Sequence, residues 1–153
     1  MPRIRRGVKA DRGKLLMKSD MDDSNVELSL REICELLDGN IVCCDEYADQ
    51  SVRSACGCDL MSDVLAFTRP GSVLLTGLTN SQVVRTAEML DLKAIVFVRS
   101  KRPDDNTVQM AKALNLVLIL SPHPLYESCG RLYGAGLPGC QGRSCATEMP
   151  AQG

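Results

Sequence analysis

Three short runs of apolar residues recur in the second half of the chain at nearly equal spacing. They are residues 73–76 (VLLT), 94–98 (AIVFV) and 116–120 (LVLIL), and their first residues lie 21 and then 22 positions apart. Each run is apolar almost throughout rather than at alternate positions, which is typical of strands covered on both faces in a parallel sheet. The pattern therefore predicts a strand–helix unit that is repeated.

A helical pattern follows each of these runs. Apolar residues three or four positions apart share one face of a helix, and the three sets are Val83, Val84, Ala87 and Leu90, then Val108, Ala111 and Leu114, then Leu125, Cys129 and Leu132. Pro103 is predicted in the first turn of the second helix. Gly134 and Gly136 are predicted to end the third. Right-handed crossovers between parallel strands should place helices on both faces of the sheet.

The first half of the chain predicts the remaining elements. Ser29 and Glu32 form the capping-box pattern of a helix that Gly39 would end. Two further strands, 40–45 and 51–58, and a helix at 60–67 with Asp59 as its cap are predicted after it. The fold class is therefore α/β: a three-layer α/β/α domain with a mostly parallel or mixed sheet of about five strands.

The domain organisation follows from where this periodicity starts and stops. Residues 29–137 are predicted to form the domain, with disordered tails at 1–28 and 138–153. The first tail is basic and then acidic, and its basic part could alternatively be an arm for nucleic acid. Translation starting at Met17 or Met21 would remove most of that arm.

The charge balance and the length of the apolar runs indicate which kinds of partner the chain is suited to bind. With 18 Lys and Arg against 19 Asp and Glu, the net charge of −1 gives no general attraction to nucleic acid or to a membrane surface. No apolar run approaches the length of a membrane span. Because no apolar signal segment follows the basic N-terminus, we expect a cytoplasmic protein whose eight cysteines are reduced.

The candidate ligand site lies at the carboxyl ends of the predicted strands, where open α/β sheets gather ligands. The loop after 73–76 offers hydroxyls, an amide and helix N–H groups, and the loop after 94–98 adds the cations Arg99, Lys101 and Arg102. The candidate ligand-binding residues are Thr76, Gly77, Thr79, Asn80, Ser81, Lys101 and Arg102. They suit an anion, such as an adenine nucleotide or another phosphorylated ligand. The alternative is an ordinary turn and cap with solvated cations. Neither established glycine-rich nucleotide motif, G-x-x-x-x-G-K-[ST] or G-x-G-x-x-G, is present.

Two aspartates and the single histidine are further candidates for metal binding or catalysis. Asp59 and Asp63, one helical turn apart, could bind a metal or perform acid–base work, or be a cap and a solvent-facing acid. His123, the single histidine, could serve as a base for a cysteine nucleophile or lie on the surface. No catalytic constellation emerges from the spacing, and no metal site is assigned.

The cysteines offer a further alternative. Cys56 and Cys58 would point to one face of a strand. If the neighbouring strand carried Cys43 and Cys44, one thiol of that pair could join them to bind zinc or sense oxidation. Buried, inert cysteines are the other interpretation.

The stretch CDLMSDVLAF, followed by residues 70–137, resembles the DRTGG domain. The matching features are the helix start at Asp59–Val64, the Thr76-Gly77 turn, the helix start at Arg102-Pro103-Asp104 and the C-terminal segment 126–137. The sequence motif after which the family is named is not present in this chain. The resemblance implies a fold like the N-terminal domain of HPr kinase. It also implies a regulatory or dimer-forming role, as in phosphate acetyltransferases and CBS-containing pyrophosphatases, and stand-alone members that are encoded beside iron-only hydrogenase components.

These observations lead to one preferred hypothesis and two alternatives. The preferred one is a non-enzymatic regulatory or ligand-sensing module that forms a homodimer and serves a metabolic or hydrogenase system. The second is a small phosphate- or nucleotide-handling enzyme that uses the Thr76 and Lys101 loops. The third is a metal or redox sensor built on cysteines.

Overall fold

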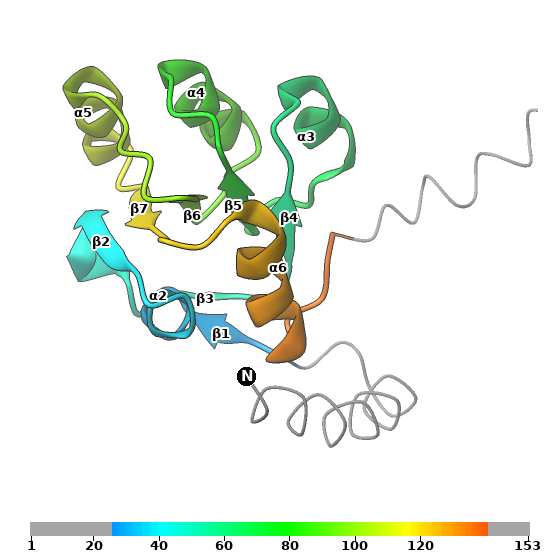
Figure 1. The fold of residues 1–153 in the computed structure, drawn as a ribbon. Coiled ribbons are helices and arrows are strands. Elements are labelled where there is room, and N and C mark those ends of the chain that lie inside the picture. Colours follow the sequence, from blue (N-terminus) through cyan, green and yellow to red (C-terminus); the bar gives the residue numbers. More distant parts are fainter. Residues whose placement is uncertain (1–25, 141–153) are drawn as a thin grey trace, which may run out of the picture.

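A computed structural model describes residues 26–140 of the chain. Figure 1 shows a central sheet with helices above and below it. The five strands stand in the order β2-β7-β6-β5-β4, with bounds Asn40–Cys43, Val117–Leu120, Ala94–Phe97, Val73–Thr76 and Ala55–Gly57. Four of them run parallel, and β2 pairs with β7 in the antiparallel sense. The predicted mixed sheet of five strands is therefore confirmed.

The helices cover both faces of this sheet (Figure 1). α3 (Met61–Phe67), α4 (Ser81–Met89) and α5 (Asp105–Ala113) lie on one face, and α2 (Leu30–Leu36) and α6 (Leu125–Gly134) lie on the other. Successive residues of β5 serve the two layers: Leu74 packs with α3 and α4, whereas Val73 and Leu75 pack with α2 and α6. All three are fully or almost fully buried. The three-layer α/β/α class is thus confirmed.

The predicted strand boundaries in the repeated units are accurate to one residue, and the helix starts are less so. Pro103 lies before the first turn of α5, because Asp104 is the cap and its side chain accepts a hydrogen bond from the Thr107 N–H at 2.8 Å. α2 ends earlier than Gly39, since Asp38 already adopts a left-handed conformation with φ of 54°. The capping box of Ser29 and Glu32 is present as predicted.

The segment predicted as one strand at 51–58 forms two. Ser51–Val52 (β3) pairs with Leu28–Ser29 (β1) in a separate two-stranded sheet, and β4 pairs with β5. The chain changes sheets at residues 53 and 54, so one continuous strand is impossible there.

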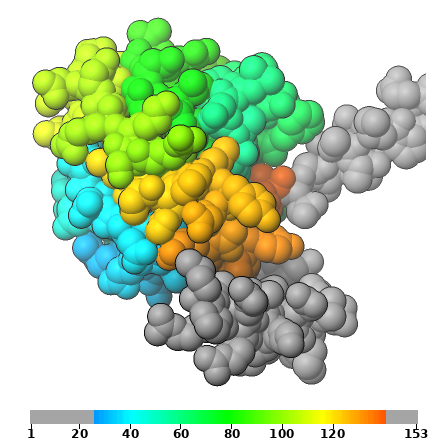
Figure 2. All heavy atoms as spheres, in the orientation of Figure 1, coloured from blue at the N-terminus to red at the C-terminus, as the bar shows by residue number. Residues whose placement is uncertain are grey.

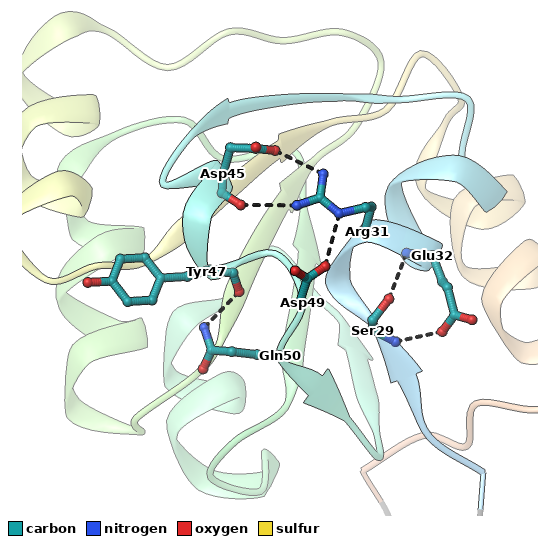
Figure 3. Close-up of polar contacts among 7 residues, drawn as sticks. All are labelled: Ser29, Arg31, Glu32, Asp45, Tyr47, Asp49 and Gln50. Carbon is teal, nitrogen blue, oxygen red and sulfur yellow. Dashed lines mark hydrogen bonds and ion pairs between the residues drawn. The ribbon is translucent and has the colours of Figure 1, made fainter.

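A polar network fastens the segment between β2 and β3 to α2. Arg31 donates from Nε to Asp49 at 3.0 Å and from a terminal nitrogen to Asp45 at 3.2 Å, beside the 3₁₀ helix η1 (Asp45–Tyr47) (Figure 3). These side chains are largely exposed, so each pair contributes little to stability. Their effect is to fix the position of the connection rather than to build a site.

The described fold reaches slightly beyond 29–137 at both ends. Leu28 pairs with Val52, and Ala55 forms a parallel bridge with Gly139. The rest of the two predicted tails, including Met17, Met21 and Cys145, lies outside the described residues. Within the described part of the chain, none of the helices combines the length and the apolar character that crossing a membrane requires.

Candidate ligand-binding cleft

A cleft of about 600 Å³ opens where the parallel strands β4, β5 and β6 end. Its walls come from the three loops that follow these strands and from the start of α6, and the lining residues are Asp59, Gly77, Leu78, Val98, Arg99, Lys101 and Leu125. Figure 2 shows the green atoms of the segments after β5 and β6 directly above the amber atoms of α6. The carboxyl ends of parallel strands are the ligand-prone edge of such a sheet.

The carboxylate of Asp59 is fixed by two short hydrogen bonds. Its Oδ1 accepts from the Thr76 hydroxyl and from the Gly77 N–H, each at 2.7 Å. The Leu78 N–H donates in turn to the Thr76 hydroxyl oxygen at 3.2 Å. Two donors predicted to bind an anion are therefore already engaged by a carboxylate of the chain itself.

This arrangement corrects the role predicted for Asp59. The cap position of α3 is Leu60, without a side-chain cap bond, and Asp59 reaches across to β5 instead of capping the helix. Thr76 and Gly77 together offer two donors to one oxygen, whereas a cap position commonly offers one. Asp63 lies within α3. No cluster of three potential metal ligands, whether with these two acids or elsewhere, occurs among residues 26–140.

The loop after β6 carries the cations of the cleft in an unusual backbone conformation. Arg99 and Ser100 have φ angles of 59° and 55°, a left-handed region that costs a non-glycine residue about 1–2 kcal/mol. Backbone bonds hold it: Arg99 N–H donates to the His123 carbonyl at 2.9 Å, and Ser100 N–H to the Ser121 carbonyl at 2.8 Å. Such strain concentrates at ligand sites. Arg99 and Lys101 are exposed, and neither forms an ion pair within the described range.

The backbone carbonyl of His123 thus helps to hold the loop after β6, and its side chain has a separate partner. Its ring Nε2 lies 3.2 Å from Asp38 Oδ2, which also accepts from Arg131 at 3.2 Å. This pairing favours a structural position over the base-for-cysteine hypothesis, because the ring partner is a carboxylate rather than a thiol.

The predicted ligand residues divide into two groups. Gly77 and Lys101 line the cleft, and buried Thr76 lies behind Asp59. Thr79, Ser81 and Arg102 lie outside the lining, and Asn80 caps α4 by accepting from the Gln82 N–H at 3.1 Å. Arg99, one of the three cations expected after residues 94–98, also lines the cleft, whereas Asp59 and Leu125 were not predicted to belong to the site. The sequence feature that could have indicated Asp59 is its position just after a predicted strand, where ligand-binding loops begin.

The structure contradicts the cysteine cluster. Cys43 and Cys44 belong to β2 or follow it, and Cys56 and Cys58 belong to β4 or follow it, but these strands form opposite edges of the sheet. Burial raises the pKa of Cys43 and Cys56, and it raises the pKa of Cys44 to about 12. Thiols with raised pKa values are poor metal ligands and react slowly with oxidants. We therefore set aside the zinc and redox hypothesis for this set.

The fold is an α/β/α domain with a cleft at the carboxyl edge of its sheet. No model of a known protein family matches the sequence, and neither does any curated protein. Among solved structures the chain is similar to the CBS and DRTGG domains of the regulatory region of Clostridium perfringens pyrophosphatase, which were crystallised with the activator diadenosine tetraphosphate. The TM-score is 0.59 at 16% identity, over 80% of this chain and 56% of the other.

This likeness concerns the fold. The chain spans little more than half the length of that regulatory region. At 16% identity the similarity supports a fold of the CBS and DRTGG kind, and the ligand named for the pyrophosphatase remains a property of that protein.

Proposed function

We propose that the protein is a non-enzymatic regulatory module of the DRTGG type that binds a phosphorylated small molecule in the cleft between β4, β5, β6 and α6. The observation that carries the proposal is the pairing of a 600 Å³ cleft with two exposed cations, Arg99 and Lys101, at the carboxyl edge of a parallel sheet. Cations at such an edge favour phosphate groups.

Two further features support regulation over catalysis. Asp59, the one carboxylate that residues 26–140 contribute to the cleft lining, is held through Oδ1 by Thr76 and Gly77, and the nearby His123 pairs with Asp38. The fold likeness is to a regulatory region rather than to a catalytic domain. A small phosphate-handling enzyme is therefore the weaker alternative.

The proposed module is a cytoplasmic homodimer whose interface includes α3. Met61 and Val64 of this helix pack on the sheet, whereas Leu60, Leu65 and Phe67 are 58, 39 and 46% exposed. An apolar patch on a short helix is a candidate contact surface, and a two-fold dimer is the commonest closed arrangement. The DRTGG resemblance further suggests a partner protein from a metabolic or hydrogenase system.

Ligand binding is tested by thermal shift with AMP, ATP and inorganic pyrophosphate, because a ligand of the native state raises the melting temperature. Lys101→Ala should weaken binding of these probes about tenfold, which corresponds to one lost charged contact. Lys112→Ala, an equal charge loss at the end of α5, is the matched control. Arg102→Ala should have little effect, since Arg102 is outside the lining. Equal shifts in the Lys101 and Lys112 variants would place the phosphate site elsewhere.

A further inference from the structure

Asp59 presents one committed oxygen and one uncommitted oxygen to the cleft. Both hydrogen bonds that the carboxylate makes within residues 26–140 end on Oδ1. Neither Arg99 nor Lys101, which line the same cleft, forms an ion pair with it. The carboxylate is thus oriented by β5 and keeps Oδ2 available as an acceptor.

Gly77 leaves the approach to this acceptor open. A Cβ atom built on Gly77 would lie 3.6 Å from Asp59 Oδ2 and 3.9 Å from Val98 Cγ2, so a side chain there would occupy cleft space beside the carboxylate. Those separations are ordinary contacts, so the absence of a side chain is not required by packing. Its consequence is free access to Oδ2.

A carboxylate weakens the binding of a bare anion beside it, because like charges a few ångströms apart repel. The cleft combines an acceptor on one side, cations on another, and apolar walls from Leu78, Val98 and Leu125. A complementary ligand needs hydrogen-bond donors, a negative group and some apolar surface in one small molecule. Phosphorylated ribose compounds have this combination.

We infer that Asp59 Oδ2 accepts hydrogen bonds from the ribose hydroxyls of a nucleotide whose phosphate lies toward Arg99 and Lys101. This inference rests on the proposed function and names the ligand class of that site. Carboxylates bind ribose hydroxyls in the same way at the carboxyl edge of other parallel sheets. The apolar walls then accommodate the sugar ring and base.

The test uses calorimetric titration of the full chain, without divalent cations, with AMP, with 2′,3′-dideoxy-AMP and with inorganic pyrophosphate. The wild-type protein should bind AMP about tenfold more tightly than the dideoxy compound, as loss of a hydrogen bond to a charged group predicts. Asp59→Asn keeps an oxygen for Thr76 and Gly77 and replaces Oδ2 with a donor. This variant should lose the preference for AMP and bind pyrophosphate at least as tightly as before.

The opposite effects on AMP and pyrophosphate separate hydrogen bonding from charge. If Asp59 only repels anions, Asp59→Asn tightens all three probes alike, and the inference fails. Equal wild-type affinity for AMP and its dideoxy analogue, or binding of pyrophosphate without AMP, also overturns it while leaving the proposed phosphate site in place. If none of the three probes binds, both the proposed phosphate site and this inference fail.

A second pair of variants checks the access route. Gly77→Ala should keep the wild-type melting temperature, because its Cβ makes only ordinary contacts, yet weaken AMP binding severalfold. Gly130→Ala on α6 is the matched control, since nothing lies within 4 Å of its added Cβ and the residue is outside the cleft lining. Unchanged AMP affinity in the Gly77 variant would contradict an approach to Oδ2 past this glycine.

Discussion

A closed ring of hydrogen bonds behind the cleft gives a prediction whose size follows from the structure. Ser121 and Ser128 are fully buried, and their hydroxyl oxygens lie 2.9 Å apart. The His123 N–H donates to Ser121 Oγ at 3.2 Å, and Ser128 Oγ donates to the His123 carbonyl at 3.3 Å. Ser121 therefore donates to Ser128, and each hydroxyl is satisfied. The same carbonyl accepts from Arg99 in the cleft.

Ser128→Ala should lower stability by about 1–2 kcal/mol. The buried Ser121 hydroxyl then loses its acceptor, a penalty of about 1–3 kcal/mol, while alanine returns a few tenths to about 0.5 kcal/mol of helix propensity in α6. For a domain of this size the melting temperature should fall by roughly 3–8 °C. Ser62→Ala on the exposed side of α3 is the control and should be neutral or slightly stabilising.

The double variant Ser121→Ala, Ser128→Ala separates a ring from two independent bonds. Its loss should be smaller than the sum of the single losses by about 0.5–1.5 kcal/mol, because the Ser121–Ser128 hydrogen bond is lost in both single variants and is therefore counted twice in their sum. Urea unfolding followed by circular dichroism gives the three free energies. Additivity within about 0.3 kcal/mol, or a neutral Ser128→Ala, would refute the ring.

Three further outcomes are expected. Light scattering should give a dimer, and Leu65→Lys should give the 16.6 kDa monomer; a wild-type monomer refutes the dimer. Gly57→Ala should destabilise by about 1–3 kcal/mol, since its Cβ meets Cys129 Sγ, and Cys129→Ala should rescue it, which paired melts would check. The hydrogen bond from the Thr107 N–H lowers the Asp104 pKa, so this cap contributes stability that is lost as the pH falls through that lowered pKa, and Asp104→Asn should flatten the acid limb of unfolding curves.

The repeated part of the fold could be predicted because its signals are local. Each of the runs 73–76, 94–98 and 116–120 is apolar on both faces and precedes an amphipathic helix, which leaves few alternatives to a parallel sheet. The segment 51–58 could not be resolved in this way, because β3 and β4 have only two and three residues. Their partners, β1 and β5, are set by contacts distant in sequence. The same limitation left open whether the strand with Cys43 and Cys44 neighbours the strand with Cys56 and Cys58, which the strand order excludes.

The sequence-predicted ligand residues follow the strand ends where the cleft opens, but they include only part of its lining. Loops after parallel strands meet at one edge, so Gly77 and Lys101 could be placed together from the sequence. Asp59 was predicted as a cap because aspartate before a helix usually is one. In the structure the Asp59 carboxylate instead accepts from Thr76, at the end of β5, and from Gly77, which follows it. This contact depends on β4 and β5 being neighbours in the sheet, which the local sequence does not determine. The place of Arg99 at this edge could be predicted, but its left-handed backbone could not, because the bonds that hold it come from His123, which is distant in sequence.

Asp59 also connects the cleft to the proposed dimer surface. It binds β5 through Thr76 and Gly77, and the next residue, Leu60, begins the exposed apolar side of α3. A ligand that engages Oδ2 would restrain the junction from which α3 starts, and restraint of that junction favours the dimer if α3 forms its interface. Coupling of this kind is reciprocal, so a ligand that tightens the dimer is itself bound more tightly by the dimer.

That coupling gives a final prediction. Saturating AMP should lower the dimer dissociation constant about fivefold or more, the lower end of typical coupling between two sites. Sedimentation of the protein over a dilution series, with and without AMP, measures the change. In Asp59→Asn the two dissociation constants should coincide, because the nucleotide no longer acts on the residue before α3. An AMP effect of equal size in wild type and variant would show that the signal reaches the interface by a route other than Asp59.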